Sequence, residues 1–295
     1  MSLVINHNLM AQNAARNLGE SYSSLGVSTR RLSSGLRVGT AADDAAGLAV
    51  RELMRSDISS LNQGVRNAND AISMIQTADG ALGVIDEKLI RMKELATQAS
   101  TGTYTSDQRL IIDSEYQAMA SEITRIASAT DFNGIYLLNG NLSGATHSGA
   151  GLNSTGKMKV HFGTGNLSAE DYYYVQINTS TASALGVGIG ATTSSGRSIS
   201  TQQLAQQSLE AINNAIVSKD KIRANLGALQ NRLSNTVQNL QIQAENLQAA
   251  ESQISDVDVA EEMTSFVRSQ ILTQSAVAML SQANSLPRMA MQLLG

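Results

Sequence analysis

The sequence predicts a mainly α-helical protein, a long antiparallel helical bundle or coiled coil whose N- and C-termini pair. Apolar residues recur at every seventh position near both ends of the chain, which keeps one seam of a helix facing a partner helix. Aromatic residues are only 3% of the 295, and there is one Pro and no Trp. A thin bundle needs little aromatic bulk. The repeat is carried by Val4, Ala11, Leu18, Leu25 and Leu32, and by Leu226, Leu233, Leu240, Leu247 and Ile254.

Composition excludes several classes of function. The net charge of −4 and the pI near 5.4 argue against nucleic-acid binding, which needs a basic face. The absence of Cys excludes disulfides and thiolate chemistry. We expect no cleavable signal peptide, because the first thirty residues lack a basic segment followed by an unbroken apolar stretch. The uncharged segment 269–287 contains too many Gln, Ser and Thr residues for a membrane span, so we expect no membrane insertion.

Helix-start and helix-stop signals divide the chain. Thr40 with Asp43 resembles a capping box, and a helix from 45 to 99 would be about 80 Å long. Similar boxes at Thr105 with Gln108 and at Ser200 with Gln203 predict two more helices, the latter running to about residue 255. Ser255, with Asp258 three residues later, indicates a hinge and the start of the last helix.

The middle of the chain differs from both ends. Met158, Val160 and Phe162 alternate with basic residues, which predicts a half-buried strand, and 172–177 reads as another strand. A small β-hairpin element with solvated loops therefore interrupts the helices. The expected segments are 1–42 and 256–295 (terminal helices), 43–140 and 200–255 (two halves of a rod), and 141–199 (hairpin and variable loops).

No catalytic constellation is present in the sequence. His7, His147 and His161 are isolated, and no metalloprotease, EF-hand or P-loop pattern occurs. The adjacent carboxylates Asp43 and Asp44 are explained by favourable charge near a helix N-terminus. The sequence predicts no enzyme, no cofactor and no metal ion.

Several long segments resemble bacterial flagellin. INHNLMAQNAARNL and LSSGLRVGTAADDAAGLAV are similar to its N-terminal signature, and DFNGIYLLNG to its helix-to-hairpin junction. The tail from AESQISDVDVAEEM to MAMQLL is similar to its C-terminus. The chain departs from longer members in its short middle, which leaves no large outer domain.

The resemblance implies a structural subunit that polymerises into the flagellar filament for motility. It implies type III export of unfolded monomers, secretion to an extracellular flagellum, and assembly at the tip. The implied partners are other copies of the chain, a flagellar export chaperone, the filament cap and the hook–filament junction proteins. A hook–filament junction protein itself and a generic coiled-coil scaffold are the alternatives. The expected assembly seams are Val4, Ala11, Leu18, Leu25 and Leu32 at the N-terminus, and Val259, Met263, Val267, Ile271 and Met279 in the last helix.

The resemblance also implies a patch for the host Toll-like receptor that senses flagellin. IRMKELATQ supplies Arg91, Glu94 and Leu95, and IDSEYQ supplies Glu115. We expect an Arg–carboxylate fork beside an exposed Leu95, because residues three or four apart share one helix surface. The alternative is an ordinary solvated helix face with an apolar Leu at a subunit contact.

Overall fold

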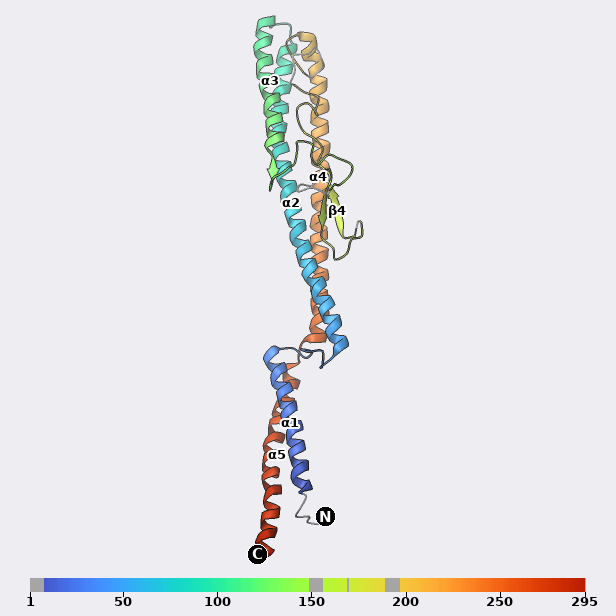
Figure 1. Ribbon diagram of the computed structural model, residues 1–295. Helices are drawn as coiled ribbons and strands as arrows, with labels where there is room; N and C mark the ends of the chain where they lie inside the picture. Colours follow the sequence, from blue (N-terminus) through green and yellow to red (C-terminus); the bar gives the residue numbers. More distant parts are fainter. Residues whose placement is uncertain (1–7, 149–155, 169, 189–196, 295) are drawn as a thin grey trace. The chain divides into compact units, whose positions relative to one another are not determined.

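The computed structural model describes residues 8–148, 156–168, 170–188 and 197–294. Beyond Ser285 it describes the helix but not the side chains. Val4 and His7 lie outside these residues. The described part contains five helices and four short strands (Figure 1). It forms two compact units, a terminal unit of Met1–Ile58 with Glu245–Gly295 and a central unit of Ser59–Ala244. The long helices α2 (Ala45–Ser100) and α4 (Gln202–Ser255) contribute to both units.

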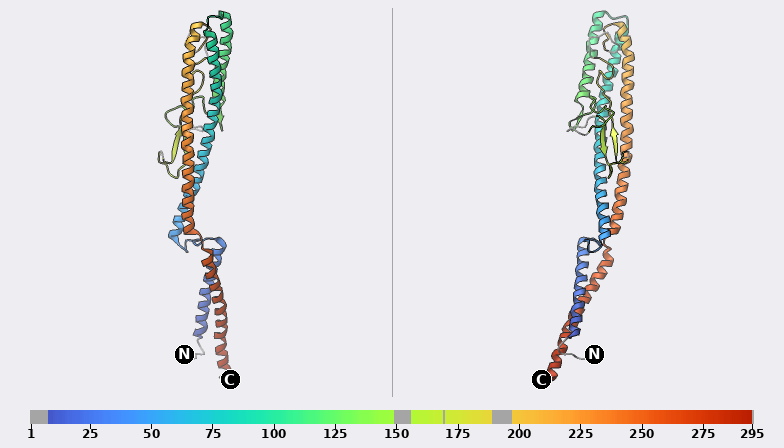
Figure 2. Two further views of the ribbon diagram at one scale, coloured as in Figure 1. Left: turned by 180° about the vertical axis from the view of Figure 1, so that it is seen from behind. Right: turned by 45° about the vertical axis from the view of Figure 1, so that its right-hand side comes forward.

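The terminal unit pairs the two ends of the chain. Helices α1 (Leu9–Ser34) and α5 (Val259–Leu294) lie side by side in every view (Figures 1 and 2). The Asn8 amide donates to the Ala283 carbonyl over 2.8 Å, and Arg31 lies 3.5 Å from Glu262 at the other end of the pair. These two contacts make α1 and α5 antiparallel. The predicted pairing of the termini is therefore confirmed.

The central unit is a helical bundle of α2, α3 (Ser106–Ala129) and α4. The predicted 45–99 helix is α2, and the capping box of Thr105 with Gln108 is formed. Apolar side chains at helical spacing build a dry core, because each helix turns one stripe inward. Its members include Ile75, Leu82, Ile85, Leu89, Met92, Tyr116, Ile123, Ile212, Leu226 and Leu233.

The helix start expected at Thr40 lies four residues later in the structure, and the one expected at Ser200 lies one residue later. Asp44 accepts the Gly47 N–H over 2.9 Å and caps α2, while Thr40 and Asp43 close a separate turn before it. Thr201 accepts the Leu204 N–H and caps α4, whereas the Ser200 N–H bonds to Ser198. In both places the capping residue stands directly before the first residue of the helix, Asp44 before Ala45 and Thr201 before Gln202.

The predicted hairpin is confirmed as the second of two, and the structure adds a shorter hairpin before it in the chain. Strands β1 (Asp131–Phe132) and β2 (Ile135–Tyr136) pair through a turn with positive φ at Asn133 and Gly134. Strands β3 (Met158–His161) and β4 (Tyr172–Val175) pair antiparallel, with Lys159 opposite Tyr174 and His161 opposite Tyr172. The second hairpin docks on α2 at Gly64, where a Cβ would lie only 2.0 Å from the Phe162 carbonyl oxygen.

A buried lysine sets how α2 and α4 align in the central unit. The Lys219 side chain is only 2% exposed, and its ammonium lies 2.5 Å from Asp86 and 2.8 Å from Asp220. One turn along, Arg223 donates to Asp79 through two nitrogens, at 2.7 and 3.2 Å. The Leu seam repeats every seven residues, so it tolerates a slip by one heptad. A buried charge pair does not, because slipping would leave the ammonium unpaired in the core.

Asp86→Leu should lower the free energy of unfolding by about 2 kcal/mol, because a buried ammonium then loses one of its two carboxylates. Adding Lys219→Met should restore most of that loss, since an apolar pair replaces the ion pair. Urea melts monitored by circular dichroism measure both values. Glu87→Leu, on the neighbouring exposed position, is the matched control. An unchanged melt for Asp86→Leu would contradict the assignment.

Candidate functional site

The α1–α5 seam uses mostly small or half-buried side chains. Ala11, Leu18, Leu25 and Leu32 are all half-buried, and Ser28 is the only fully buried residue in α1. On α5 the buried members are Glu262, Thr273 and Ala283, within the part whose side chains are described. Little apolar area is therefore removed from water by this pair alone.

The seam also contains residues that the heptad search missed. Ala14, Ser21 and Ser28 stand three residues after each apolar repeat position and are turned inward with it. They complete the two inward positions of each heptad, and their small size lets the helices approach closely. These three small residues recur every seven positions, and that repeat in the sequence could have identified them as members of the seam.

The apolar residues expected as a seam on α5 are exposed. Val259, Val267 and Ile271 are 59%, 44% and 57% exposed, and Met263 and Met279 are similarly open. The residues on the α1 side of the helix are instead Phe266, Ser269, Thr273, Ala276 and Leu280. Apolar side chains thus lie around much of the circumference of α5, while α1 covers one side of it.

A backbone clasp closes the terminal unit where its helices end. Leu36 and Asp256 form an antiparallel bridge, flanked by hydrogen bonds from the Arg37 N–H to the Ser255 carbonyl and from the Val257 N–H to the Gly35 carbonyl. Gly35 adopts the left-handed conformation that ends α1. The two linkers therefore meet as a two-stranded contact, although about 220 residues separate them in the sequence.

Two arginines tie the clasp to the helix ends. The Arg37 guanidinium donates to the Ile254 carbonyl over 2.6 Å, in the last turn of α4, where cations stabilise the unpaired carbonyls. Arg51, nearly buried, donates to the Val38 carbonyl over 2.7 Å and pairs with Glu52. Neither role was foreseen from the sequence, because both arginines bind backbone carbonyls and leave no pattern of side chains to read.

The predicted receptor patch is partly assembled in the central unit. Arg91 donates to Glu115 on α3 through Nε and Nη2, at 2.9 and 2.8 Å, and to Glu94 through Nη1 at 3.0 Å. The hydrogen bonds that Arg91 donates to Glu115, and then to Glu94, raise the pKa of Arg91. The expected fork of one Arg between two carboxylates is thus present on the surface.

Leu95 does not belong to that surface. Its side chain is 1% exposed and packs in the bundle core, so the expectation of an exposed Leu beside the fork was wrong. The helical phase explains the error, because Leu95 lies on the same inward stripe as Met92 and Ala99. Ile90, which is 49% exposed, is the apolar neighbour that solvent reaches.

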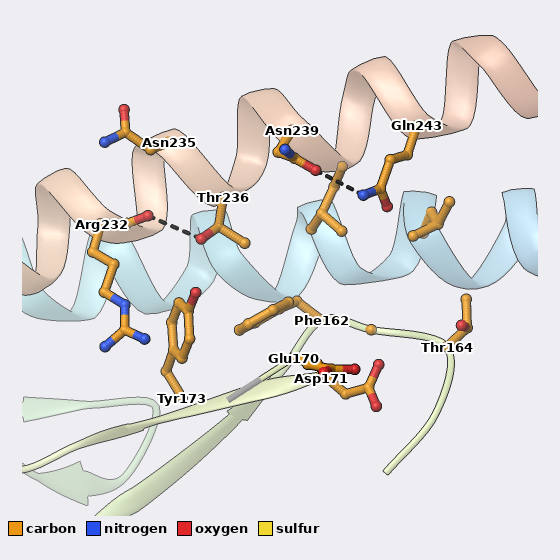
Figure 3. Close-up of a pocket in the computed structure, with 13 residues that line it drawn as sticks. Phe162, Thr164, Glu170, Asp171, Tyr173, Arg232, Asn235, Thr236, Asn239 and Gln243 are labelled. Atoms are coloured by element: carbon orange, nitrogen blue, oxygen red, sulfur yellow. Dashed lines mark hydrogen bonds between the residues drawn. The ribbon is translucent and has the colours of Figure 1, made fainter. Parts of the chain in front are cut away.

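A polar groove of about 490 Å³ runs between the second hairpin and α4 in the central unit (Figure 3). Amides from α4 line one wall, and Glu170 and Asp171 lie on the other. The Asp171 carboxylate already accepts hydrogen bonds from the Leu167 and Gly165 N–H groups, at 2.7 and 3.2 Å. These bonds lower the pKa of Asp171. Arg232 covers the face of Tyr173, with 3.7 Å from guanidinium carbon to ring centroid.

The described residues offer no group of three or more His, Asp or Glu side chains that could hold a metal ion. Within the same residues, no helix is both long and apolar enough to cross a membrane.

Comparisons with known proteins agree with this architecture. The bacterial flagellin N-terminal helical region matches residues 5–143, and the bacterial flagellin C-terminal helical region matches residues 209–294. The chain is 41% identical to flagellin FlaB2 of Treponema pallidum over 292 residues, covering 99% of this chain and 100% of that protein. It is 40% identical to a flagellin of Halalkalibacterium halodurans with the same coverage.

The chain belongs to the bacterial flagellin family. It is a structural subunit of the bacterial flagellar filament, which is extracellular and built by self-assembly, and it is not an enzyme. A solved putative flagellar hook-associated protein from Vibrio parahaemolyticus is 15% identical, with a TM-score of 0.55, over 72% of this chain and 100% of that one. At that identity the likeness shows a shared fold and nothing about the hook.

Replacing Leu36 and Asp256 by Cys should give a disulfide under mild oxidation, because directly opposed residues of this bridge type lie about 4.5 Å apart at Cα. The natural chain has no Cys to compete. Gel mobility with and without reductant, with thiol counting, measures closure. Cys at Leu36 and the exposed Gln253 is the control and should stay reduced. Equal closure of both pairs would show that the clasp is not formed in solution.

Proposed function

We propose that the exposed apolar side of α5 is the main surface through which copies of this chain pack in the filament. Its members are Val259, Met263, Val267, Ile271 and Met279. The observation that supports this is the distribution of apolar side chains around α5. A helix that is apolar on several sides is normally buried on several sides, and α1 covers only one of them.

The weak interior of the α1–α5 pair supports the same proposal. Its seam buries small and polar residues, so its own burial offsets little of the entropy lost on ordering more than fifty residues. Neighbouring copies would supply the missing apolar contact. Stability of the terminal unit would then depend on assembly.

The small internal burial of the α1–α5 pair is compatible with export of the chain through a narrow channel. We propose that the chain is secreted unfolded through the flagellar type III exporter, with an export chaperone on its C-terminal helix. It would add to the filament beneath the cap, beyond the hook–filament junction proteins. The chain has no Cys, so no disulfide would oppose unfolding.

We also propose that monomers are ligands of the host Toll-like receptor for flagellin, through Arg91, Glu94 and Glu115. The support is the family resemblance and the surface fork that these side chains form. Leu95 would act only indirectly, by supporting the helix that carries Arg91, because it is buried. The alternative, an ordinary solvated ion-pair cluster, predicts no effect of Arg91 on recognition.

Val267→Asp with Ile271→Asp should abolish filament growth, because two charges would be buried against neighbouring copies without partners. The monomer should keep its helicity, since both positions are exposed in the isolated chain. Sedimentation and electron microscopy after seeding measure growth, and circular dichroism checks the fold. Gln238→Asp with Gln241→Asp, which adds the same charge to exposed positions of α4 in the central unit, is the matched control. Normal filaments from the Val267, Ile271 variant would exclude this surface.

Arg91→Ala should reduce receptor signalling by monomers about tenfold, the usual size for a charged interface anchor. Leu95→Ala should instead lower the free energy of unfolding by about 2–4 kcal/mol, as core truncations do. Reporter cells exposed to monomer measure signalling, and urea melts measure stability. Arg125→Ala, which breaks a similar exposed pair with Glu122, is the control. Full signalling by Arg91→Ala would leave only the solvated-cluster alternative.

A further inference from the structure

The second hairpin concentrates the aromatic residues of an aromatic-poor chain. Of three Phe and seven Tyr, four lie in or next to β3 and β4: Phe162, Tyr172, Tyr173 and Tyr174. Packing against the helices explains only part of this set. Val160, Phe162 and Val175 are buried, whereas Tyr172 and Tyr174 stay half-exposed on the opposite face of the hairpin. The assembly surface proposed above lies on α5 and does not include this face.

The exposed face alternates ammonium groups with tyrosine rings. The Lys159 ammonium lies 3.7 Å from the centroid of the Tyr172 ring, and the Lys157 ammonium 4.2 Å from that of Tyr174. The two rings meet edge to face at 5.4 Å. His161 lies 6.2 Å from Tyr172, between ring centroids. We call Lys157, Lys159, His161, Tyr172 and Tyr174 the lysine–tyrosine face.

The hairpin carries basic side chains on its exposed face and acidic ones beside α4. After the hydrogen bonds from backbone N–H groups, the charges of His161 and Lys159 contribute to the lowered pKa of Asp171. Glu170 and Asp171 line the groove beside α4 (Figure 3), and Asp171 is occupied by backbone N–H groups. None of the ion pairs formed among the described residues includes Lys157 or Lys159. The segments 149–155 and 189–196 carry no ionisable side chain in the sequence. A cationic face thus persists in a chain whose net charge is −4.

We propose that the lysine–tyrosine face binds an acidic polysaccharide, one that carries sulfate or carboxylate groups along its length. Two lysines at alternate positions of one strand stand about 7 Å apart, so both can contact acid groups on one extended polymer. The tyrosine hydroxyls and the His161 imidazole supply hydrogen-bonding groups for sugar hydroxyls. Cation–ring contacts hold the ammonium groups in place before binding, which reduces the entropy lost on association.

The geometry favours a polysaccharide over a single-stranded nucleic acid. Nucleic-acid bases stack on open aromatic faces. Here a lysine covers one face of each exposed ring, and the neighbouring tyrosine meets it edge to face. The Lys159 ammonium donates to Asn166 over 3.0 Å and keeps two further N–H donors, so ring edges and cations remain for the ligand, and these match a polyhydroxylated anion. A filament subunit displays such a face outside the cell.

The test measures binding of full-length monomer and of filaments to heparin and to polygalacturonate, with dextran as the neutral comparison and single-stranded DNA as the competing polyanion. Lys157→Gln with Lys159→Gln should weaken the Kd for the acidic polysaccharides about tenfold and reduce its salt dependence. Lys93→Gln with Lys221→Gln, which removes the same charge from exposed positions on α2 and α4, should change it less than about twofold.

A second variant separates binding from folding of the hairpin. Lys157→Arg with Lys159→Arg keeps the charge and the ring contacts, so binding should be retained within about threefold. The proposal is overturned if wild-type protein binds neither acidic polysaccharide, or if the Lys93, Lys221 control loses binding equally. It is also overturned if DNA binds as tightly as heparin. Binding by monomer but not by filaments would instead identify the face as a contact between copies.

Discussion

Antiparallel pairing of helices that lie far apart in the sequence is the constraint on which this structure depends. In the central unit, α2 and α4 are aligned by buried leucines such as Leu226 and Leu233 and by the Lys219–Asp86 ion pair. In the terminal unit, α1 and α5 are aligned by two contacts: the Asn8–Ala283 hydrogen bond at one end of the pair and the Arg31–Glu262 ion pair at the other. Both pairs bring the two halves of the chain together, so neither half can bury its seam without the other.

The two pairs differ in how much of their stability is internal. The central bundle encloses large side chains such as Met74, Leu82 and Tyr116, all essentially inaccessible to water. Between α1 and α5 the fully buried residues are small or polar, and most of the large apolar side chains of α5 face outward, Phe266 and Leu280 excepted. The central unit thus has a core of its own, whereas much of the apolar surface of α5 requires contacts from outside the chain.

Charge is used differently in the two settings. The Lys219 ammonium is buried, so it needs the carboxylates of Asp86 and Asp220 as partners. The same pairing opposes a shift in the register of α2 against α4. The Arg91 fork and the lysine–tyrosine face are open to solvent, where an ion pair contributes little stability. Solvent-exposed cations held in place by rings or carboxylates are better suited to recognition than to folding.

The sequence by itself determined the fold class, the family and the helix pattern, because a seven-residue repeat and capping residues are local and periodic. It placed α2 within a residue and foresaw the half-buried strand β3. Tertiary structure decided the rest. Leu95 became core, since a phase of one residue decides which side of a helix is covered. The clasp at Leu36 and Asp256 and the backbone contacts of Arg37 and Arg51 had no sequence signal, because they join main-chain groups of distant segments. The faces of α5 were also undetermined, since an apolar repeat does not say whether its partner is the same chain or another copy.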